Sequence, residues 1–312
     1  MKISTLVPTY CRTDRLQKCL VALEHQTRIA DEVIIVVRDS DSETHRFLDG
    51  FTSNVLQLKI VTVTIAGQIA ALNAGLDAAQ GDIIAITDDD AAPHVNWLER
   101  IEAYFIADES VGGVGGRDWV YHGDRLEDGK QGSVIGQVQW FGRVIGNHHL
   151  GCDAPCEVEI LKGANMSYRK TAIEAIKFDQ RLRGTGAQVH NDMAFSLALK
   201  RAGWKLIYDP LVAVNHYPAQ RFDEDERNQF NRLAFLNQVH NETLALLDYL
   251  PPLRRFAFLL WAILVGTSTN LGLAQLLRLL VKDGEPAIEK WFVSLEGRWQ
   301  GWQTWRKTGG QY

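Results

Sequence analysis

Short apolar runs alternate with amphipathic stretches over residues 1–116, and this alternation constrains the fold more than any other feature of the chain. The runs are rich in Val, Ile and Thr, as strands buried on both faces of a sheet are; they are Ser4 to Val7, Val33 to Val37, Ile60 to Thr64 and Ile83 to Thr87. Between them, apolar residues recur at helical spacing. The pattern predicts βαβ units, and therefore an α/β fold with a mostly parallel sheet flanked by helices.

Length and charge narrow the class of protein. A chain of 312 residues has room for one substantial domain with an appendage, which we place at residues 1–222 and 223–312. Its 33 basic residues are outnumbered by 38 acidic ones, so we expect no nucleic-acid partner. An apolar run begins almost at Met1, without the basic start and longer apolar stretch of a signal peptide. We therefore expect a cytoplasmic protein.

The segment 256–281 dominates the C-terminal helical region. It carries no charged residue before Arg278 and is long enough for one membrane span. Polar residues from Thr267 to Asn270 interrupt it, so a helical hairpin or a helix in the membrane plane is an equal alternative. The tryptophans that follow are typical of an interfacial aromatic belt; they are Trp291, Trp299, Trp302 and Trp305. We expect contact with the inner-membrane surface, the alternative being a helical subdomain packed on the N-terminal domain or on a second protomer.

Three carboxylates, Asp88, Asp89 and Asp90, directly follow an uninterrupted strand-like run. In a parallel sheet, ligands bind outside the carboxyl ends of the strands, and alternate residues such as Asp88 and Asp90 point the same way. Two convergent carboxylates suit Mg²⁺ or Mn²⁺, whose remaining ligands would be water and a nucleotide diphosphate. The alternative is a solvated turn that caps the next helix, but a cap needs only one carboxylate. We therefore predict a divalent metal site.

Polar residues also follow the first two predicted strands, at Pro8 to Tyr10 and at Arg38 to Asp41. Both segments open onto the same edge of the sheet, where Asp39 is a candidate acceptor for the ring N–H of a base. No Gly-x-Gly-x-x-Gly motif follows the first strand, which argues against a nicotinamide or flavin enzyme.

Several segments together resemble the family 2 glycosyltransferases of the GT-A fold, and their order and spacing match as well. They are Val7-Pro8-Thr9-Tyr10, Val37-Arg38-Asp39, the stretch from Gly67 to Gly75 with Gly81-Asp82, and Asp88-Asp89-Asp90 with Trp97-Leu98. The resemblance covers about the first 220 residues and implies inversion at the anomeric carbon, a divalent metal (Mn²⁺ or Mg²⁺) at Asp88 and Asp90, and a nucleotide-diphosphate sugar donor, a UDP-sugar above others. The implied donor-binding residues are Pro8, Thr9, Tyr10, Arg12, Asp39, Gln68, Asn73, Asp88 and Asp89.

The resemblance continues in the second half of the domain. Gly163, Ala164 and Asn165 fall in a small-residue segment that resembles the family's lining of the sugar and acceptor pocket, where backbone approaches the ligand closely. His190-Asn191-Asp192 stands where the family has Glu-Asp, which implies that Asp192 is the catalytic base. Asn191 replaces the Glu, which puts its acceptor contact in doubt. His216 stands where some relatives present a metal or diphosphate ligand, and a structural histidine is the alternative.

The resemblance implies a non-processive enzyme of the bacterial surface-polysaccharide type. Processive relatives carry a Gln-x-x-Arg-Trp motif, of which Gln220-Arg221-Phe222 is only a faint echo. The apolar C-terminal segment suggests a lipid-linked or other glycan acceptor at the cytoplasmic face of the inner membrane. Two alternatives stay open: a sugar nucleotidyltransferase, although no Gly-rich basic loop precedes Asp14, and a non-catalytic nucleotide-sugar-binding membrane adaptor.

Overall fold

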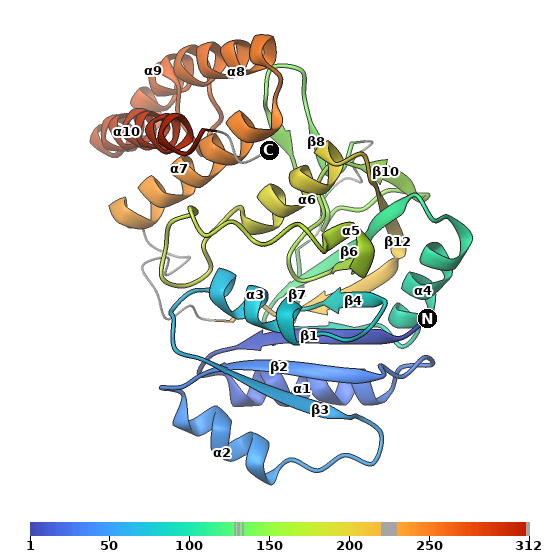
Figure 1. The fold of residues 1–312 in the computed structure, drawn as a ribbon. Coiled ribbons are helices and arrows are strands. Elements are labelled where there is room, and N and C mark those ends of the chain that lie inside the picture. Colours follow the sequence, from blue (N-terminus) through green and yellow to red (C-terminus); the bar gives the residue numbers. More distant parts are fainter. Residues whose placement is uncertain (128, 130–131, 133, 220–229, 310–312) are drawn as a thin grey trace.

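A computed structural model describes residues 1–127, 129, 132, 134–219 and 230–309, with one large sheet at its centre (Figure 1). The strands of this sheet follow the order β10-β12-β6-β11-β4-β1-β2-β3, with β5 paired to β12 and β7 to β6. A separate pair joins β8 (Gln137–Val138) to β9 (Val144–Ile145). The α/β fold predicted from the alternating runs is therefore confirmed.

The N-terminal half of the sheet is wholly parallel, because β1 pairs with β2 and β4, and β2 pairs with β3, in that sense. Its strands lie close to the predicted runs: β1 (Ile3–Thr9), β2 (Glu32–Arg38), β3 (Leu58–Val63) and β4 (Ile83–Ile86). The helices between and after them are α1 (Thr13–Glu24), α2 (Ser42–Gly50), α3 (Gln68–Ala78) and α4 (Trp97–Ala107).

Beyond β4 the sheet is mixed, because β11 lies antiparallel between β4 and β6. The remaining strands are β5 (Ala91–Pro93), β6 (Val111–His122), β7 (Arg125–Leu126), β10 (Cys156–Val158), β11 (Met166–Arg169) and β12 (Lys205–His216). The helices α5 (Lys170–Ile173) and α6 (Asn191–Arg201) separate the last two strands. The long strand β12 has a register shift in its middle, between Asp209 and Val214.

Side chains alternate between two hydrophobic cores, one on each face of the sheet. Leu6 and Ile34 contribute to a core with α3 and α6, whereas the neighbouring Val7 and Ile35 contribute to a core with α1 and α4. This arrangement explains why the first strands read as continuous apolar runs: both of their faces are covered.

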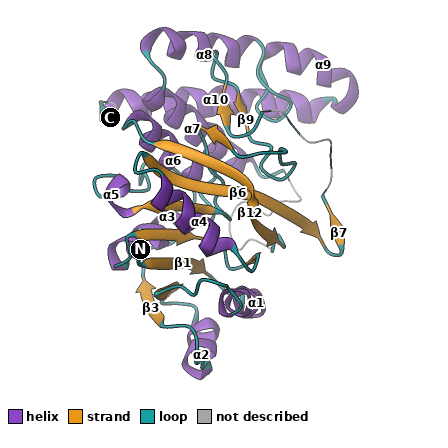
Figure 2. Cartoon of the chain, turned by 90° about the vertical axis from the view of Figure 1, so that its right-hand side faces the viewer, coloured by secondary structure: helices purple, strands orange, loops and turns teal. Residues whose placement is uncertain are grey.

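Four helices complete the chain and lie together at one end of the molecule (Figures 1 and 2). They are α7 (Arg232–Tyr249), α8 (Pro252–Leu264), α9 (Leu273–Asp283) and α10 (Glu285–Thr308). The apolar segment 256–281 folds as two helices, α8 and α9, with a Gly266–Leu271 bridge in the turn between them, as the hairpin alternative predicted. Among the described residues, none of the helices combines the length and the apolar character that crossing a bilayer demands. The expected domain boundary at residue 222 lies outside the described residues.

The C-terminal tryptophans do not form a continuous exposed belt. Trp302 and Trp305 pack against a core built from α6, α7 and α8, and Trp291 packs against Leu271 and Leu276. Only Trp299 of these four has more than half of its surface exposed, at 56%. The aromatic side chains therefore pack the helices together, which the spacing of the tryptophans in the sequence does not reveal.

Candidate active site

A cavity of about 240 Å³, here named the edge cavity, opens at the carboxyl ends of β1 to β4. Its lining residues are Pro8, Thr9, Tyr10, Arg12, Val36, Arg38, Val63, Ile65, Gly67, Gln68, Ala71, Asp88, Asp89, Asp90, Thr185, Gly186 and Ala187. Pro8 to Tyr10, Arg38 and Asp88 to Asp90 each follow or end a strand, and we expected them at one edge of the sheet. They share one cavity, as the topology of a parallel sheet predicts. The acidic trio of the prediction faces this cavity.

Asp88 and Asp90, which line this cavity, form a cluster with His216 that is suited to a metal ion. Each of Asp88, Asp90 and His216 offers one ligand atom, and these three atoms all lie within 4.8 Å of one another. Asp88 and Asp90 follow β4, and His216 is the last residue of β12. The cluster therefore joins residues that are far apart in the sequence, and it contains the three predicted metal ligands.

Asp89 and Asp90 are almost fully buried, and each is held by fixed partners. Thr9 Oγ1 donates to Asp89 Oδ2 at 2.8 Å, and Arg12 Nη1 lies 3.1 Å from Asp89 Oδ1 and 3.8 Å from Asp90 Oδ2. The backbone N–H of Ala219 donates to Asp90 Oδ2 at 2.8 Å. These contacts fix the direction of the carboxylates and bring Arg12 to the same cluster.

The three carboxylates differ in their affinity for protons. Burial and the neighbouring charge of Asp90 raise the pKa of Asp88 to about 6. Burial raises the pKa of Asp89 to about 7, although the Arg12 guanidinium opposes this shift. Burial also opposes ionisation of Asp90, but hydrogen bonding and charge from His216 hold its pKa at about 2. Asp90 is therefore the most firmly ionised of the three.

Asp118 and Lys162 extend the cluster, and sequence reasoning missed both. Asp118 of β6 is fully buried and forms an ion pair with Lys162 Nζ, while His216 Nδ1 lies 3.1 Å from Asp118 Oδ1. Burial alone would lower the pKa of His216, but hydrogen bonds to Asp118 and Asp90 raise it to about 10. The carboxylate of Asp118 therefore orients the imidazole that faces Asp90, an arrangement common behind metal-binding histidines.

The predicted base lies near the acidic cluster. Gln68 Nε2 donates to Asp88 Oδ1 at 3.3 Å, and Asn191 Nδ2 donates to Gln68 Oε1 at 3.3 Å, so two hydrogen bonds lead from Asp88 to the residue before Asp192. The partly exposed carboxylate of Asp192 accepts from Gly163 N at 3.1 Å and from Met193 N at 2.8 Å. The structure thus brings Gly163, Asn191 and Asp192 together beside Gln68.

Several predicted site residues hold the backbone and do not line the edge cavity. Asn73 exchanges two hydrogen bonds of 2.9 Å with the backbone of Phe178. Asn165 is buried and binds Trp97 Nε1 and Val212 O, each at 2.8 Å, and Ala164 is buried beside it. Asp39 is exposed and lies outside the lining residues.

Asn191 also has a defined structural role. Its Nδ2 donates to Ala187 O at 2.9 Å as well as to Gln68, while its buried Oδ1 has no hydrogen-bond partner. A glutamate at this position would have no N–H for those acceptors. The replacement of the family's Glu by Asn191 therefore supports the local backbone in this chain.

Sequence reasoning also missed part of the lining. Val63 and Ile65 come from the end of β3, and residues 185–187 come from the loop before α6. Val63 and Ile65 could have been found by extending the strand-end argument to β3. The loop residues carry no comparable signal, because their place depends on a long-range contact.

The donor atoms of the cluster fit a divalent cation of the Mg²⁺ or Mn²⁺ kind. Two carboxylates and one imidazole supply mainly oxygen ligands, which these ions prefer. The Nε2 atom of the buried His216 lies 3.2 Å from Asp90 Oδ1, while its Nδ1 atom is held by Asp118 at 3.1 Å. An imidazole nitrogen fixed from behind and directed at a carboxylate is positioned as a ligand.

A cavity at the carboxyl ends of parallel strands, beside an acidic cluster, is the place where α/β enzymes bind their ligands. The profile of the family described as "Glycosyl transferase family 2" matches residues 4–176, more than half of the chain. The chain therefore belongs to glycosyl transferase family 2 and is a glycosyltransferase. The resemblance inferred from its motifs is confirmed.

Known proteins agree with this assignment. Glycosyltransferase AglE from Haloferax volcanii is 27% identical over 269 residues, which cover 85% of this chain and 80% of AglE. Among solved structures, S. aureus TarS matches with a TM-score of 0.61 at 16% identity, over 96% of this chain and 49% of TarS, so the chain spans about half of that protein. Its fragment 1-349 was solved with UDP-GlcNAc and matches over 92% of its length at a TM-score of 0.60.

A second solved neighbour is the mannosyltransferase PcManGT from Pyrobaculum calidifontis, whose structure contains GDP-Man and Mn²⁺. It matches with a TM-score of 0.56 at 17% identity, over 97% of this chain and 84% of its own. These likenesses show that the chain has the GT-A fold.

Proposed function

We propose that this enzyme transfers a single sugar, with inversion, from a nucleotide-diphosphate sugar to an acceptor hydroxyl, and that a divalent cation at Asp88, Asp90 and His216 is required. The observation that carries this proposal is the cluster of these three side chains, two of which, Asp88 and Asp90, line the edge cavity. The neighbours solved with UDP-GlcNAc and GDP-Man support a nucleotide-sugar donor, and a UDP-sugar is our first expectation.

In the proposed reaction, the acceptor oxygen attacks the anomeric carbon while the bond from that carbon to the diphosphate oxygen breaks. Asp192 takes the proton of the acceptor hydroxyl, and its hydrogen bonds to Gly163 N and Met193 N hold the carboxylate in one orientation. A bound Mn²⁺ or Mg²⁺ would neutralise charge on the leaving diphosphate. Arg12, which lies beside Asp89 and lines the same cavity, adds a fixed positive charge near that position.

We further propose a lipid-linked or other glycan acceptor at the cytoplasmic face of the inner membrane, as in bacterial surface-polysaccharide assembly. Support comes from the apolar residues that α8 and α9 leave exposed; they are Leu253, Phe256, Leu260, Ile263, Leu264, Leu273, Leu277, Leu280 and Val281. The chain belongs to glycosyl transferase family 2, and this excludes the sugar nucleotidyltransferase alternative. A non-catalytic adaptor would bind the nucleotide sugar without turnover, so replacement of Asp192 would have no activity to abolish.

Nucleotide binding with and without metal tests the proposal. We expect Mn²⁺ together with UDP or GDP to raise the melting temperature of the wild-type protein, because a ligand that binds only the native state stabilises it. Asp90→Ala should lose this metal-dependent shift, whereas Asp77→Ala, which removes an exposed carboxylate of α3, should keep it. A nucleotide response independent of metal, or an unchanged response in Asp90→Ala, would contradict the proposed metal site.

A further inference from the structure

The loop before α6 forms one wall of the edge cavity in an unusual backbone conformation. Residues 185–187 line the cavity, and the loop ends at His190, the residue before α6. Two non-glycine residues of this loop, Gln188 and His190, have φ values of 44° and 74°. Such conformations persist only where surrounding contacts hold them. The question is therefore which residues hold this loop.

On the cavity side, the loop is fastened to the start of α3. Gly186 O accepts from Gln68 N at 2.8 Å, and Gln188 Oε1 accepts from Ile69 N at 2.9 Å. These bonds satisfy two N–H groups at the N-terminus of α3, which otherwise lack partners within the helix. The loop and the cavity residue Gln68 are thereby set relative to each other.

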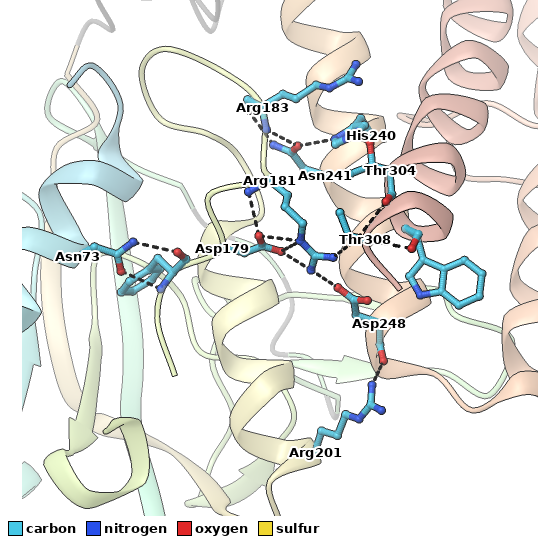
Figure 3. A network of polar contacts seen from close by, with 12 residues as sticks. Asn73, Asp179, Arg181, Arg183, Arg201, His240, Asn241, Asp248, Thr304 and Thr308 are labelled. Atoms are coloured by element: carbon cyan, nitrogen blue, oxygen red, sulfur yellow. Dashed lines mark hydrogen bonds and ion pairs between the residues drawn. The ribbon is translucent and has the colours of Figure 1, made fainter. Parts of the chain in front are cut away.

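On the opposite side, one side chain of α7 closes the base of the loop (Figure 3). Asn241 Oδ1 accepts from Arg183 N at 2.8 Å, and Asn241 Nδ2 donates to Arg183 O and to Val189 O, each at 3.0 Å. His240 Nδ1 lies 2.9 Å from the same Oδ1. Asn241 is 0% exposed. These four contacts occupy both N–H donors of its amide and both acceptor positions of its oxygen.

Two arginines add further contacts between the loop and the C-terminal helices. Arg181 holds Asp179 through bonds of 2.7 to 2.9 Å, donates to Thr308 Oγ1 of α10 at 2.8 Å and forms an ion pair with Asp248 of α7 (Figure 3). Arg183 Nη1 donates to Gln300 of α10. These side chains are partly exposed, whereas the amide of Asn241 is fully enclosed and bridges both ends of the segment 183–189.

We infer that Asn241 is a positioning residue for the donor site: by joining Arg183 to Val189, it sets the segment 185–187 against the edge cavity and fixes the approach to Asp192. The helical C-terminal region is then part of the machinery of the site, although none of its described residues, 230–309, lines the edge cavity. The catalytic consequence rests on the proposed function, but the control of the loop by Asn241 does not.

The test compares Asn241→Ala with the wild type by hydrogen–deuterium exchange and by kinetics. Removal of the amide leaves Arg183 N–H and two partly buried carbonyls without this partner, so we expect exchange within residues 183–190 to accelerate by about tenfold. The KM for the donor that the wild type uses should rise by about threefold or more, because the wall of the cavity is no longer fixed.

Asn270→Ala is the matched control. Asn270 is also a buried amide of the C-terminal region, but it donates to Glu242 Oε2 and has no bond to the loop. It should lose stability without faster exchange at 183–190 and without a change in donor KM. If Asn241→Ala does not fold, Asn241→Ser, whose hydroxyl retains one bond, takes its place and should show a smaller change in the same direction.

Exchange within 183–190 that equals the wild type in a folded Asn241 variant would overturn the inference. Faster exchange with an unchanged donor KM would overturn its catalytic part. Failure of the wild type to bind UDP or GDP with Mn²⁺ would instead count against the proposed function, and the exchange measurement would still decide the role of Asn241.

Discussion

Asp192 combines a partly exposed carboxylate with two backbone N–H donors that hold it in place. An amide at this position still accepts a hydrogen bond from Gly163 N but has no affinity for the acceptor proton. We therefore expect Asp192→Asn to keep metal-dependent nucleotide binding and to lower kcat by about 10²- to 10⁴-fold. Isothermal titration with UDP or GDP and a nucleotide-release assay measure the two quantities separately. Full turnover in this variant would exclude Asp192 as the base.

His240 lies in the interior between α7 and α10, where Thr304 Oγ1 is 2.9 Å from its Nε2. Burial lowers its pKa from the ordinary 6.5 to about 4. Between pH 6.5 and 4 the unfolded chain binds a proton that the folded chain does not, so stability falls as the pH is lowered through this window.

We expect this histidine to contribute a slope of at most about 1.4 kcal/mol per pH unit. His240→Gln cannot titrate and should therefore lose less stability than the wild type between pH 6.5 and 4.5. Urea unfolding at several pH values gives both slopes. Equal slopes would show that His240 is not kept neutral by the fold.

Site residues that directly follow a strand could be predicted from the sequence. Site residues whose position depends on how two distant strands pair could not. Asp88 and Asp90 stand directly after an apolar run, so their place at the sheet edge could be inferred. Asp118 lies inside β6, and it reaches His216 only because β6 pairs with β12 in a register that places Asp118 opposite Val214. Asn73 and Asn165 belong to recognisable segments, but only the structure shows that their amides bind backbone.

Helix α3 illustrates how an element is positioned. A Cβ atom added to Gly75 would lie 2.1 Å from Leu6 Cδ1 of β1, so the helix packs on the strand with no room for a side chain. Alanine normally stabilises a helix interior relative to glycine, but here the added methyl group displaces either the buried Leu6 side chain or α3 itself.

We expect Gly75→Ala to reduce the free energy of unfolding by about 1–3 kcal/mol. Gly50→Ala, at the end of α2, is the comparison, because nothing lies within 4 Å of the added Cβ. That variant should be neutral or slightly more stable. Urea denaturation of both variants checks the prediction, and a stabilised Gly75→Ala would refute the close packing.

Elements whose contacts are local were predicted well, and those defined by distant partners were not. The apolar periodicity of α1, α3 and α6 follows from faces that pack on the sheet. The reversal of β11 between two strands has no sequence signature, because a strand covered on both faces looks alike in either direction. Likewise, the place of residues 185–187 depends on contacts with elements distant in the sequence, such as the bond from Gln68 N of α3 to Gly186 O.

At the scale of the whole molecule, the C-terminal helices share a core with the sheet-containing part. Leu246 and Phe258 pack with Met193 and Leu197 of α6 and with Ile160. A shared core of this kind couples the two regions, so we expect them to unfold in one transition.

We expect Leu246→Ala to lower the stability of the entire chain by about 2–5 kcal/mol. Tryptophan fluorescence, to which residues of both regions contribute, and far-UV circular dichroism should give the same shifted midpoint in urea. Leu253→Ala removes a side chain that is 70% exposed and should change neither. Two separate midpoints would show that the C-terminal helices unfold independently.

The close contact between Gly75 and Leu6 has a consequence for how the edge cavity can change shape. Helix α3 lies against the Leu6 side chain of β1 with no space for an added Cβ atom, so we expect this wall of the cavity to move little. We expect ligands of different size to be accommodated instead by the segment 183–189, which is held by individual hydrogen bonds from α3, α6 and α7.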